Sequence, residues 1–245
     1  IYKYYLYFPG TQDEIEEIWE IIKNLVRSVL ASWRKPDRSI WEYRTKKMHF
    51  VFSKVMSWVA IDRASLIAEL LQREYYAATW RREADIIKAE VHEKGWNEEL
   101  QCFTQAYENN DYDSSLLLMQ FYDFIEPDNE RYVKTVRAIK ENLYHEGLMY
   151  RYKAEDDFGV PTSSFTICTF WLIEALFKIG EIEEAREIFE KMISYSNHLG
   201  LYSEDLDFKT KRQLGNFPQA YSHLAFINTA VLFSEEKRLS QFIRP

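Results

Sequence analysis

The chain has 245 residues, a formal net charge of −8 and 47% hydrophobic residues, which excludes wholesale disorder and argues against nucleic acid as its partner. Its seven glycines and six prolines are few, since the two types together make up roughly 12% of average proteins. This scarcity disfavours an all-β sandwich and favours long helices. The two cysteines, Cys102 and Cys168, form neither a disulfide scaffold nor a metal motif, and no run of eighteen apolar residues occurs. We therefore expect a cytoplasmic protein without a membrane partner.

Apolar residues recur with helical spacing along nearly the whole chain, and two kinds of helix alternate. Four predicted helices are amphipathic, and four are apolar on most sides, which is typical of buried helices. In chain order the eight segments are residues 14–33, 50–71, 76–94, 114–124, 129–143, 165–177, 183–198 and a last helix opened by Pro218. Gly200 is placed to end the seventh helix. Residues 2–8 form the only segment with a strand-like pattern.

This alternation predicts an all-α fold in which outer and inner helices form two concentric rings, an α/α toroid. An irregular helical bundle is the alternative. The links from outer to inner helices are long, comprising residues 34–49, 95–113, 144–164 and 201–217. In an alternating double ring these four loops emerge at one end, where a binding site is normally built.

The four loops combine carboxylates, aromatic rings and arginines, a combination suited to carbohydrate. Aromatic rings stack on sugars, charged groups bind hydroxyls, and two carboxyl groups can cleave a glycosidic bond. Acidic loops in an acidic protein can also be merely solvated. The sequence has no Gly-x-Ser-x-Gly elbow and no glycine-rich phosphate loop, and its five histidines share no metal-ligand spacing.

Three segments together resemble the signatures of glycoside hydrolase family 15, which contains glucoamylases, glucodextranases and some microbial trehalases. The first is Ser39-Ile-Trp-Glu42-Tyr-Arg44, followed by His49-Phe-x-x-Ser53-Lys54. The second joins Arg151-Tyr152 and Asp156 to the Cys168-Thr-Phe-Trp171 helix. The third is Leu201-Tyr-Ser-Glu204-Asp-x-Asp207, followed by Leu214-Gly-Asn-Phe-Pro. The resemblance implies an (α/α)6 barrel, in agreement with the alternating helices.

The resemblance also implies the roles of individual residues. Glu42 matches the general acid and Glu204 the general base of an inverting mechanism, which requires no metal or other cofactor. Their carboxyl groups are then expected roughly 6.5–9.5 Å apart, leaving room for the attacking water.

The resemblance further implies a set of substrate-binding residues. Arg151 and Asp156 are similar to residues that hold the terminal sugar, with Asp157 as the alternative to Asp156. Trp41 and Arg44 line the acid side. Bond selectivity is expected from Trp96 and residues 98–113. Asp207 is expected to orient the base loop, and not to take part in the chemistry.

An (α/α)6 barrel needs six pairs of helices, whereas the pattern predicts four pairs. We therefore expect residues 1–245 to be a single domain, the C-terminal two-thirds of a catalytic barrel. Alone it is expected to be weakly active or inactive, and to self-associate through an exposed apolar flank.

The leading function is an exo-acting inverting α-glucosidase of the glucoamylase type, which releases β-glucose from the ends of α-glucans. An α,α-trehalase using the same two carboxylates is the first alternative. The second is a non-catalytic helical toroid that binds carbohydrate or protein.

Overall fold

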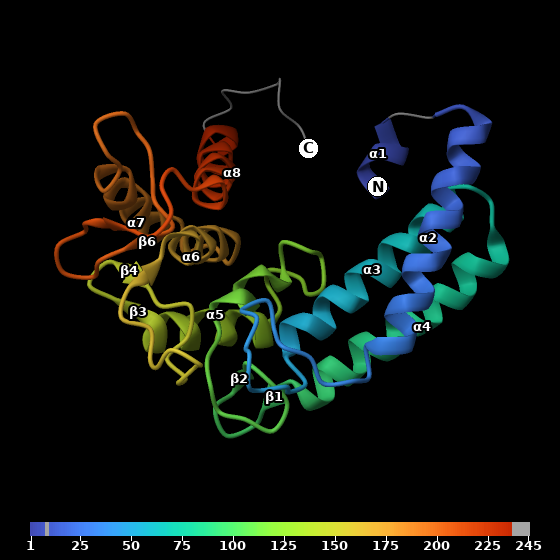
Figure 1. The fold of residues 1–245 in the computed structure, drawn as a ribbon, viewed down its shortest axis with the longest axis horizontal. Coiled ribbons are helices and arrows are strands. Elements are labelled where there is room, and N and C mark those ends of the chain that lie inside the picture. Colours follow the sequence, from blue (N-terminus) through green and yellow to red (C-terminus); the bar gives the residue numbers. More distant parts are fainter. Residues whose placement is uncertain (8–9, 237–245) are drawn as a thin grey trace. The chain divides into compact units, whose positions relative to one another are not determined.

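The computed structural model describes residues 1–7 and 10–236, and the backbone contacts divide the chain into two compact units (Figure 1). The first unit comprises Ile1–Asn97 and Thr104–Asn109. The second unit comprises Glu98–Phe103 and Asn110–Pro245. Each unit is described by itself below.

The first unit is built on three long helices. Its elements are α1 (Tyr2–Tyr7), α2 (Gln12–Ser32), α3 (Val51–Leu70), α4 (Glu74–Lys94) and the short strand β1 (Trp96–Asn97). α3 packs along α4 and also contacts α2 and α1. α3 is therefore the central helix of this unit.

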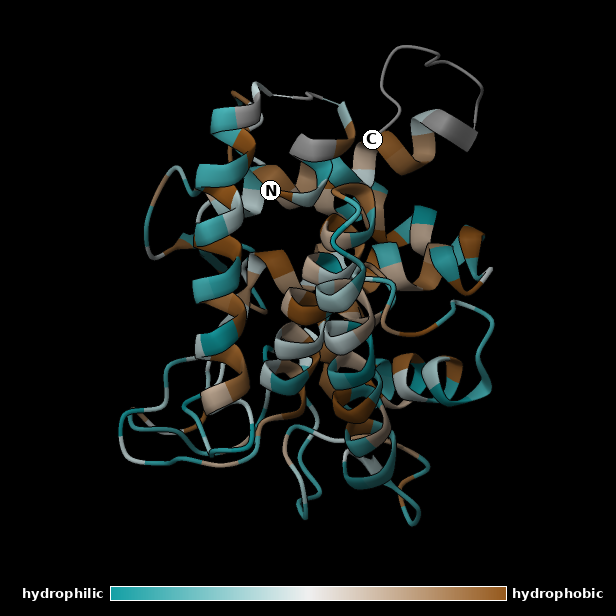
Figure 2. Cartoon of the chain, turned by 90° about the vertical axis from the view of Figure 1, so that its right-hand side faces the viewer, coloured by the Kyte–Doolittle hydropathy of each residue, from teal (hydrophilic) through white to brown (hydrophobic). Residues whose placement is uncertain are grey.

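Local sequence explains where α2 begins and which side it buries. The hydroxyl of Thr11 accepts a hydrogen bond from the Glu14 backbone N–H, and the Glu14 carboxylate accepts one from the Thr11 N–H, which forms a capping box. Trp19, Ile22 and Val26 lie on one face of α2 and are buried. Hydrophilic and hydrophobic residues alternate along α2 in Figure 2, as a one-sided helix requires.

α3 is buried on most of its circumference, as its apolar sequence predicts. Its buried residues include three polar side chains, Lys54, Asp62 and Ser65. The Asp62 carboxylate accepts hydrogen bonds from the guanidinium groups of Arg63 and Arg81. A buried charge is tolerated only when it is paired, and the two buried charged groups of α3, Lys54 and Asp62, meet that condition.

The second unit is centred on α6, which contacts α7, α8 and the 3-10 helix η1. Its elements in chain order are β2 (Cys102–Phe103), η1 (Ser114–Met119), α5 (Glu130–Leu143), β3 (Tyr144–His145), β4 (Leu148–Met149), β5 (Ser164–Phe165), α6 (Thr166–Lys178), α7 (Ile182–Ser194), β6 (Asp205–Leu206), β7 (Gln213–Leu214) and α8 (Ala220–Glu236). The core residues Phe170, Leu172 and Ile173 of α6 are completely buried. Both cysteines are buried and unpaired.

Two loops of the second unit meet in a small antiparallel sheet with the strand order β5-β6-β7. β5 ends the loop after β4, and β6 and β7 form a hairpin in the loop between α7 and α8. Phe165 lies opposite Asp205, which in turn lies opposite Leu214. β6 begins directly after Glu204, whose own backbone donates to the Asn216 carbonyl and accepts from the Thr166 N–H, each at 2.9 Å.

The structure differs from the sequence patterns at three places. Residues 2–7 form helix α1 and no strand, while Phe8 lies outside the described residues. The apolar segment 114–124 forms only the short 3-10 helix η1, which Asp113 caps and which the chain leaves in turns after Met119. α7 ends at Ser194, ahead of Gly200, which lies in a later turn with φ +75°.

The last helix also begins later than expected. α8 starts at Ala220, two residues after Pro218, and its outer side exposes Tyr221, Leu224 and Ile227 by more than half. Self-association through such a surface stays a prediction.

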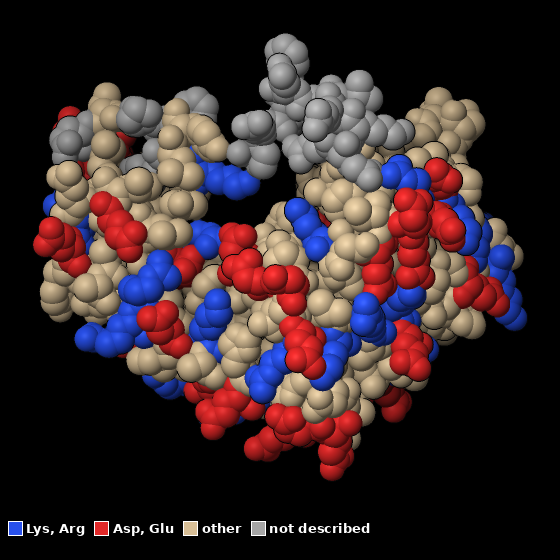
Figure 3. Space-filling model, turned by 180° about the vertical axis from the view of Figure 1, so that it is seen from behind, with Lys and Arg blue, Asp and Glu red and all other residues tan. Residues whose placement is uncertain are grey.

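Charged side chains of both signs are interspersed over the face shown in Figure 3. No helix of the described residues has an apolar stretch long enough to cross a bilayer.

Candidate active site

The loop that carries Glu42 is fixed through its backbone. Asp37 and Met48 exchange two backbone hydrogen bonds of 2.9 and 3.1 Å, which close the loop at its base. Within it, Ser39 and Glu42 adopt left-handed conformations with φ +65° and +56°. The Glu42 N–H donates to the Ser39 carbonyl over 3.2 Å. Such conformations are costly for residues other than glycine, so the surrounding contacts must maintain them.

Tyr43 anchors the other side of Glu42. Its ring is buried and stacks on Phe50 at a centroid distance of 5.4 Å, and its hydroxyl accepts a hydrogen bond from Gln105 Nε2 at 3.3 Å. Arg38 donates to the carbonyls of Tyr43 and Arg44. Glu42 is thus flanked by two fixed backbone segments.

The side chains around Glu42 remain accessible. Glu42 and Arg44 are exposed and Trp41 is half-buried. Among the described residues, the Glu42 carboxylate has no hydrogen-bond partner. A carboxyl group in this state is available to an incoming ligand.

Glu204, by contrast, is fixed through its side chain. Its Oε2 atom accepts hydrogen bonds from the backbone N–H and the Nδ2 atom of Asn216, at 3.1 and 2.9 Å. Gly215 adopts φ +74°, and a Cβ at this position would lie only 2.8 Å from Glu204 Oε2. The close approach of the carboxylate therefore requires glycine here. The Leu214-Gly-Asn segment of the third signature contains Gly215 and Asn216, but the sequence analysis assigned neither residue a role.

The first turn of α8 supports the segment before Glu204. The Ser222 hydroxyl donates to the Ser203 carbonyl at 2.8 Å, and the Gln219 N–H donates to the Tyr202 carbonyl at 3.0 Å. His223 Nε2 accepts from the Tyr202 N–H at 3.2 Å, while its Nδ1 lies 2.7 Å from the Gln219 carbonyl. These partners assign the proton to Nδ1.

Arg151 and Asp156, which the resemblance assigns to the terminal sugar, contact each other in the structure. Arg151 Nη2 and the Tyr152 hydroxyl donate to Asp156 Oδ2 at 2.9 and 2.7 Å, and the Phe158 N–H donates to Oδ1 at 2.7 Å. Burial alone would raise the pKa of Asp156, but these hydrogen bonds and the guanidinium charge lower it. Asp156, and not Asp157, is therefore the ion-pair partner of Arg151.

These groups line a cavity of about 220 Å³ within the second unit. This is smaller than the roughly 300–1,000 Å³ of pockets for drug-sized ligands. The cavity is also lined by Phe158, Phe165, Ser163 and Asp205.

Asp205 is a site residue that sequence reasoning left without a role. Its carboxylate accepts a hydrogen bond from the Ser163 hydroxyl. Burial and the negative charge of Glu204 raise the pKa of Asp205, and they outweigh the Ser163 hydrogen bond, which lowers it. Only its position directly after Glu204 could have pointed to it.

The other candidates lie in less accessible or more peripheral places. Trp96 is buried in β1, with 9% of its surface exposed. Asp207 closes the turn of the β6–β7 hairpin by accepting hydrogen bonds from Lys209 and Thr210. The residues that the structure describes contain no cluster of three or more potential metal ligands. Glu42 belongs to the first unit and Glu204 to the second, so their separation stays a prediction.

Comparison with known proteins places these motifs in one family. The family model described as glycosyl hydrolases family 15 matches residues 1–231. A trehalase of Mycobacterium tuberculosis is 41% identical over 231 residues, which cover 93% of this chain and 34% of that protein. A trehalase of Thermoplasma volcanium is 37% identical over 219 residues, which cover 89% of this chain and 35% of that protein.

A bacterial glucoamylase complexed with acarbose has a similar structure, with a TM-score of 0.73 and 14% identity over 91% of this chain and 38% of that one. This likeness confirms the predicted fold class, an all-α (α/α)6 barrel of which the chain forms a part. The chain spans about a third of the length of the curated trehalases that it matches.

Proposed function

Because the chain belongs to glycosyl hydrolase family 15, we propose that it supplies both catalytic carboxylates of an α,α-trehalase, with Glu42 as general acid and Glu204 as general base. The observation that carries the substrate is the identity of 31–41% to six curated trehalases, which extends over 89–94% of the chain. Trehalose therefore replaces α-glucan ends as the leading substrate. The glucoamylase activity favoured from the sequence becomes the second candidate, since the likeness to a glucoamylase structure at 14% identity concerns the fold.

The proposed reaction inverts one anomeric centre. Glu42 gives its proton to the oxygen that links the two glucose units, and Glu204 takes a proton from the water that attacks the opposite face. Cleavage of trehalose with one water then yields one β-glucose and one α-glucose. Each carboxyl group ends in the protonation state opposite to its starting one, and exchange with solvent restores both.

The surroundings of Glu204 support its role as the base. Asn216 donates two hydrogen bonds to one carboxylate oxygen, which leaves the other oxygen available to a water. The cavity beside Arg151 and Asp156 offers donors and acceptors for sugar hydroxyls. Phe158 and Phe165 provide apolar surface for the ring.

The decisive experiment follows the products by NMR, using the full-length gene product and trehalose, maltose, isomaltose and soluble starch. We expect trehalose to be cleaved into equal amounts of α- and β-glucose at early times. Glucose release from maltose and starch, with trehalose left uncleaved, would contradict the trehalase proposal and favour a glucoamylase. Release from none of the four would favour the non-catalytic toroid.

Two substitutions test the carboxylates themselves. Glu42→Gln and Glu204→Gln are each expected to lower kcat for trehalose by roughly 10²–10⁴-fold, because each removes a proton-transfer group. Sugar binding, measured by calorimetry, should survive in both variants. Unchanged turnover in either variant contradicts the assignment of that residue. The cytoplasmic location stays a prediction.

A further inference from the structure

We propose that Asp37, clamped by the buried Lys54, is a positioning residue for the general acid Glu42. This inference rests on the proposed function, in which Glu42 protonates the glycosidic oxygen. All the residues concerned belong to the first unit.

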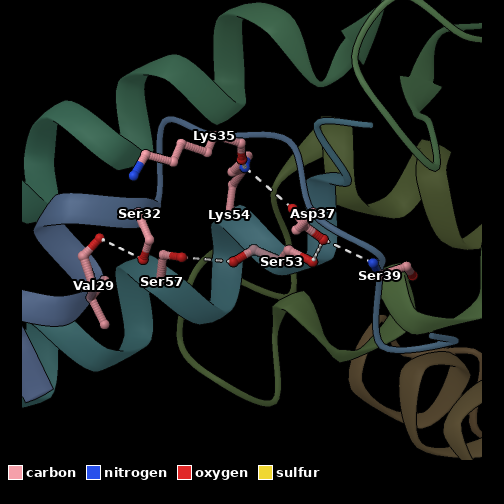
Figure 4. Close-up of polar contacts among 8 residues, drawn as sticks. All are labelled: Val29, Ser32, Lys35, Asp37, Ser39, Ser53, Lys54 and Ser57. Atoms are coloured by element: carbon pink, nitrogen blue, oxygen red, sulfur yellow. Dashed lines mark hydrogen bonds and ion pairs between the residues drawn. The ribbon is translucent and has the colours of Figure 1, made fainter. Parts of the chain in front are cut away.

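The clamp is an ion pair between the buried Lys54, at the start of α3, and the partly exposed Asp37 (Figure 4). The Lys54 side chain is 2% exposed, and its Nζ atom lies 3.3 Å from Asp37 Oδ2 and 2.7 Å from the Lys35 carbonyl. The Ser53 hydroxyl donates to Asp37 Oδ1 at 2.6 Å. An ammonium group buried this deeply is costly unless it is paired, so Lys54 and Asp37 fix each other strongly.

Asp37 also holds the backbone of the turn that precedes Glu42. Its Oδ1 atom also accepts a hydrogen bond from the Ser39 N–H at 2.8 Å (Figure 4). The Ser39 carbonyl then accepts from the Glu42 N–H at 3.2 Å. Two hydrogen bonds thus connect the clamped carboxylate with the backbone of the general acid.

The backbone of this turn needs such support. Ser39 and Glu42 both lie in the left-handed region, which side chains other than glycine adopt only where the surroundings impose it. The Asp37–Ser39 hydrogen bond fixes the first of these residues, and the Ser39–Glu42 hydrogen bond fixes the second. Without the clamp, we expect the turn to relax and Glu42 to leave its position.

Displacement of a general acid has a specific chemical signature. A misplacement of about 1 Å costs roughly 100-fold in rate, but only where the acid is needed. Departure of an alkoxide from trehalose requires a proton, whereas fluoride leaves α-D-glucosyl fluoride with little protonic help. A defect that acts through Glu42 therefore impairs the first substrate and spares the second, while a general loss of structure impairs both.

The experiment measures kcat for trehalose and for α-D-glucosyl fluoride with the full-length gene product. For Lys54→Met and Asp37→Asn we expect roughly 100-fold loss on trehalose and less than about threefold loss on the fluoride. Glu42→Gln provides the reference for complete loss of the acid. Lys47→Met makes the same chemical change at an exposed position of the same loop, and is expected to leave both rates unchanged.

Two results would overturn the inference: equal losses on both substrates, or full trehalose activity in both clamp variants. If Lys54→Met lowers the melting temperature so far that it is unfolded in the assay, Ser53→Ala decides instead. That variant retains the ion pair, and we expect it to lower kcat for trehalose by about tenfold without lowering kcat for the fluoride. An unchanged ratio of the two kcat values would contradict the proposal.

The reference variant separates the two proposals. If Glu42→Gln hydrolyses trehalose as fast as the wild type, the proposed function fails, and this inference fails with it. If Glu42→Gln loses trehalose turnover and the clamp variants do not, the positioning role alone is wrong.

Discussion

The two loops that carry Glu42 and Glu204 fix their carboxylates in opposite ways. The first loop constrains the backbone of Glu42 through Asp37 and Ser39 and leaves the carboxylate exposed. The second loop binds the Glu204 carboxylate directly through Asn216 and packs it against Gly215.

This difference suits the two proposed roles. A general acid gives up its proton to a leaving oxygen and has to reach it, whereas a general base must hold one water in line for attack. Substitutions near Glu204 should therefore act on the carboxylate itself, and substitutions near Glu42 should act through the backbone. The following variants, assayed in the full-length gene product, test that difference.

Gly215→Ala is expected to have the largest effect of the variants beside Glu204. The new Cβ would lie 2.8 Å from Glu204 Oε2, so the carboxylate must move. We expect kcat for trehalose to fall by roughly 10²-fold or more. The matched control is Gly180→Ala, which has a similar left-handed φ of +90° with no atom within 4 Å of the new Cβ. It should lower the melting temperature and preserve kcat; equal kcat losses in the two variants would show that backbone strain alone is responsible.

Asn216→Ala is expected to have a smaller effect. It removes the 2.9 Å hydrogen bond from Nδ2, but the backbone N–H still donates to Glu204 at 3.1 Å. A hydrogen bond to a charged group is worth about 1.5–3 kcal/mol, so we expect kcat to fall by roughly 10- to 100-fold. Steady-state kinetics with trehalose provide the measurement. A change confined to KM would mean that Asn216 contacts the substrate instead.

Glu174→Gln should change stability without changing kcat, since Glu174 of α6 contacts Thr229 of α8 and takes no part in the proposed site. The Thr229 hydroxyl donates to Glu174 at 3.0 Å, and burial raises the pKa of Glu174 to about 7, against the effects of that hydrogen bond and of Lys178. The folded state therefore binds more protons than the unfolded state between about pH 4.5 and 7, and its stability falls as the pH rises through this window. Above pH 7 the penalty is complete and amounts to about 3 kcal/mol at most.

The Glu174→Gln substitution removes the destabilisation caused by the buried carboxylate charge. The melting temperature of Glu174→Gln should exceed that of the wild type at pH 8, and the two should converge near pH 4. Glu190→Gln makes the same change at an exposed position of α7 and should show no such trend. A difference in melting temperature that is the same at pH 4 and pH 8 would exclude the titration of Glu174 as its cause.

Much of the fold follows from local sequence. The period of the apolar residues located seven of the eight predicted helices to within a few residues of their observed ends. It failed for residues 114–124, where an apolar segment forms only a short 3-10 helix, and for residues 2–7, where a strand-like pattern forms a helix. In both places the periodic signal is short, so tertiary contacts outweigh the local preference.

The sequence by itself determined the family and the helical class, and it indicated the two carboxylates that we propose as catalytic, because motifs and helical periods are local properties of the chain. Only the tertiary structure decided that Asp156 is the partner of Arg151, that Gly215 packs against Glu204, and that Lys54 clamps Asp37. These contacts join backbone segments whose approach depends on packing and on loop geometry. The spacing of residues along the chain does not indicate which charged side chains will pair. That pairing depends on how the folded segments pack against one another.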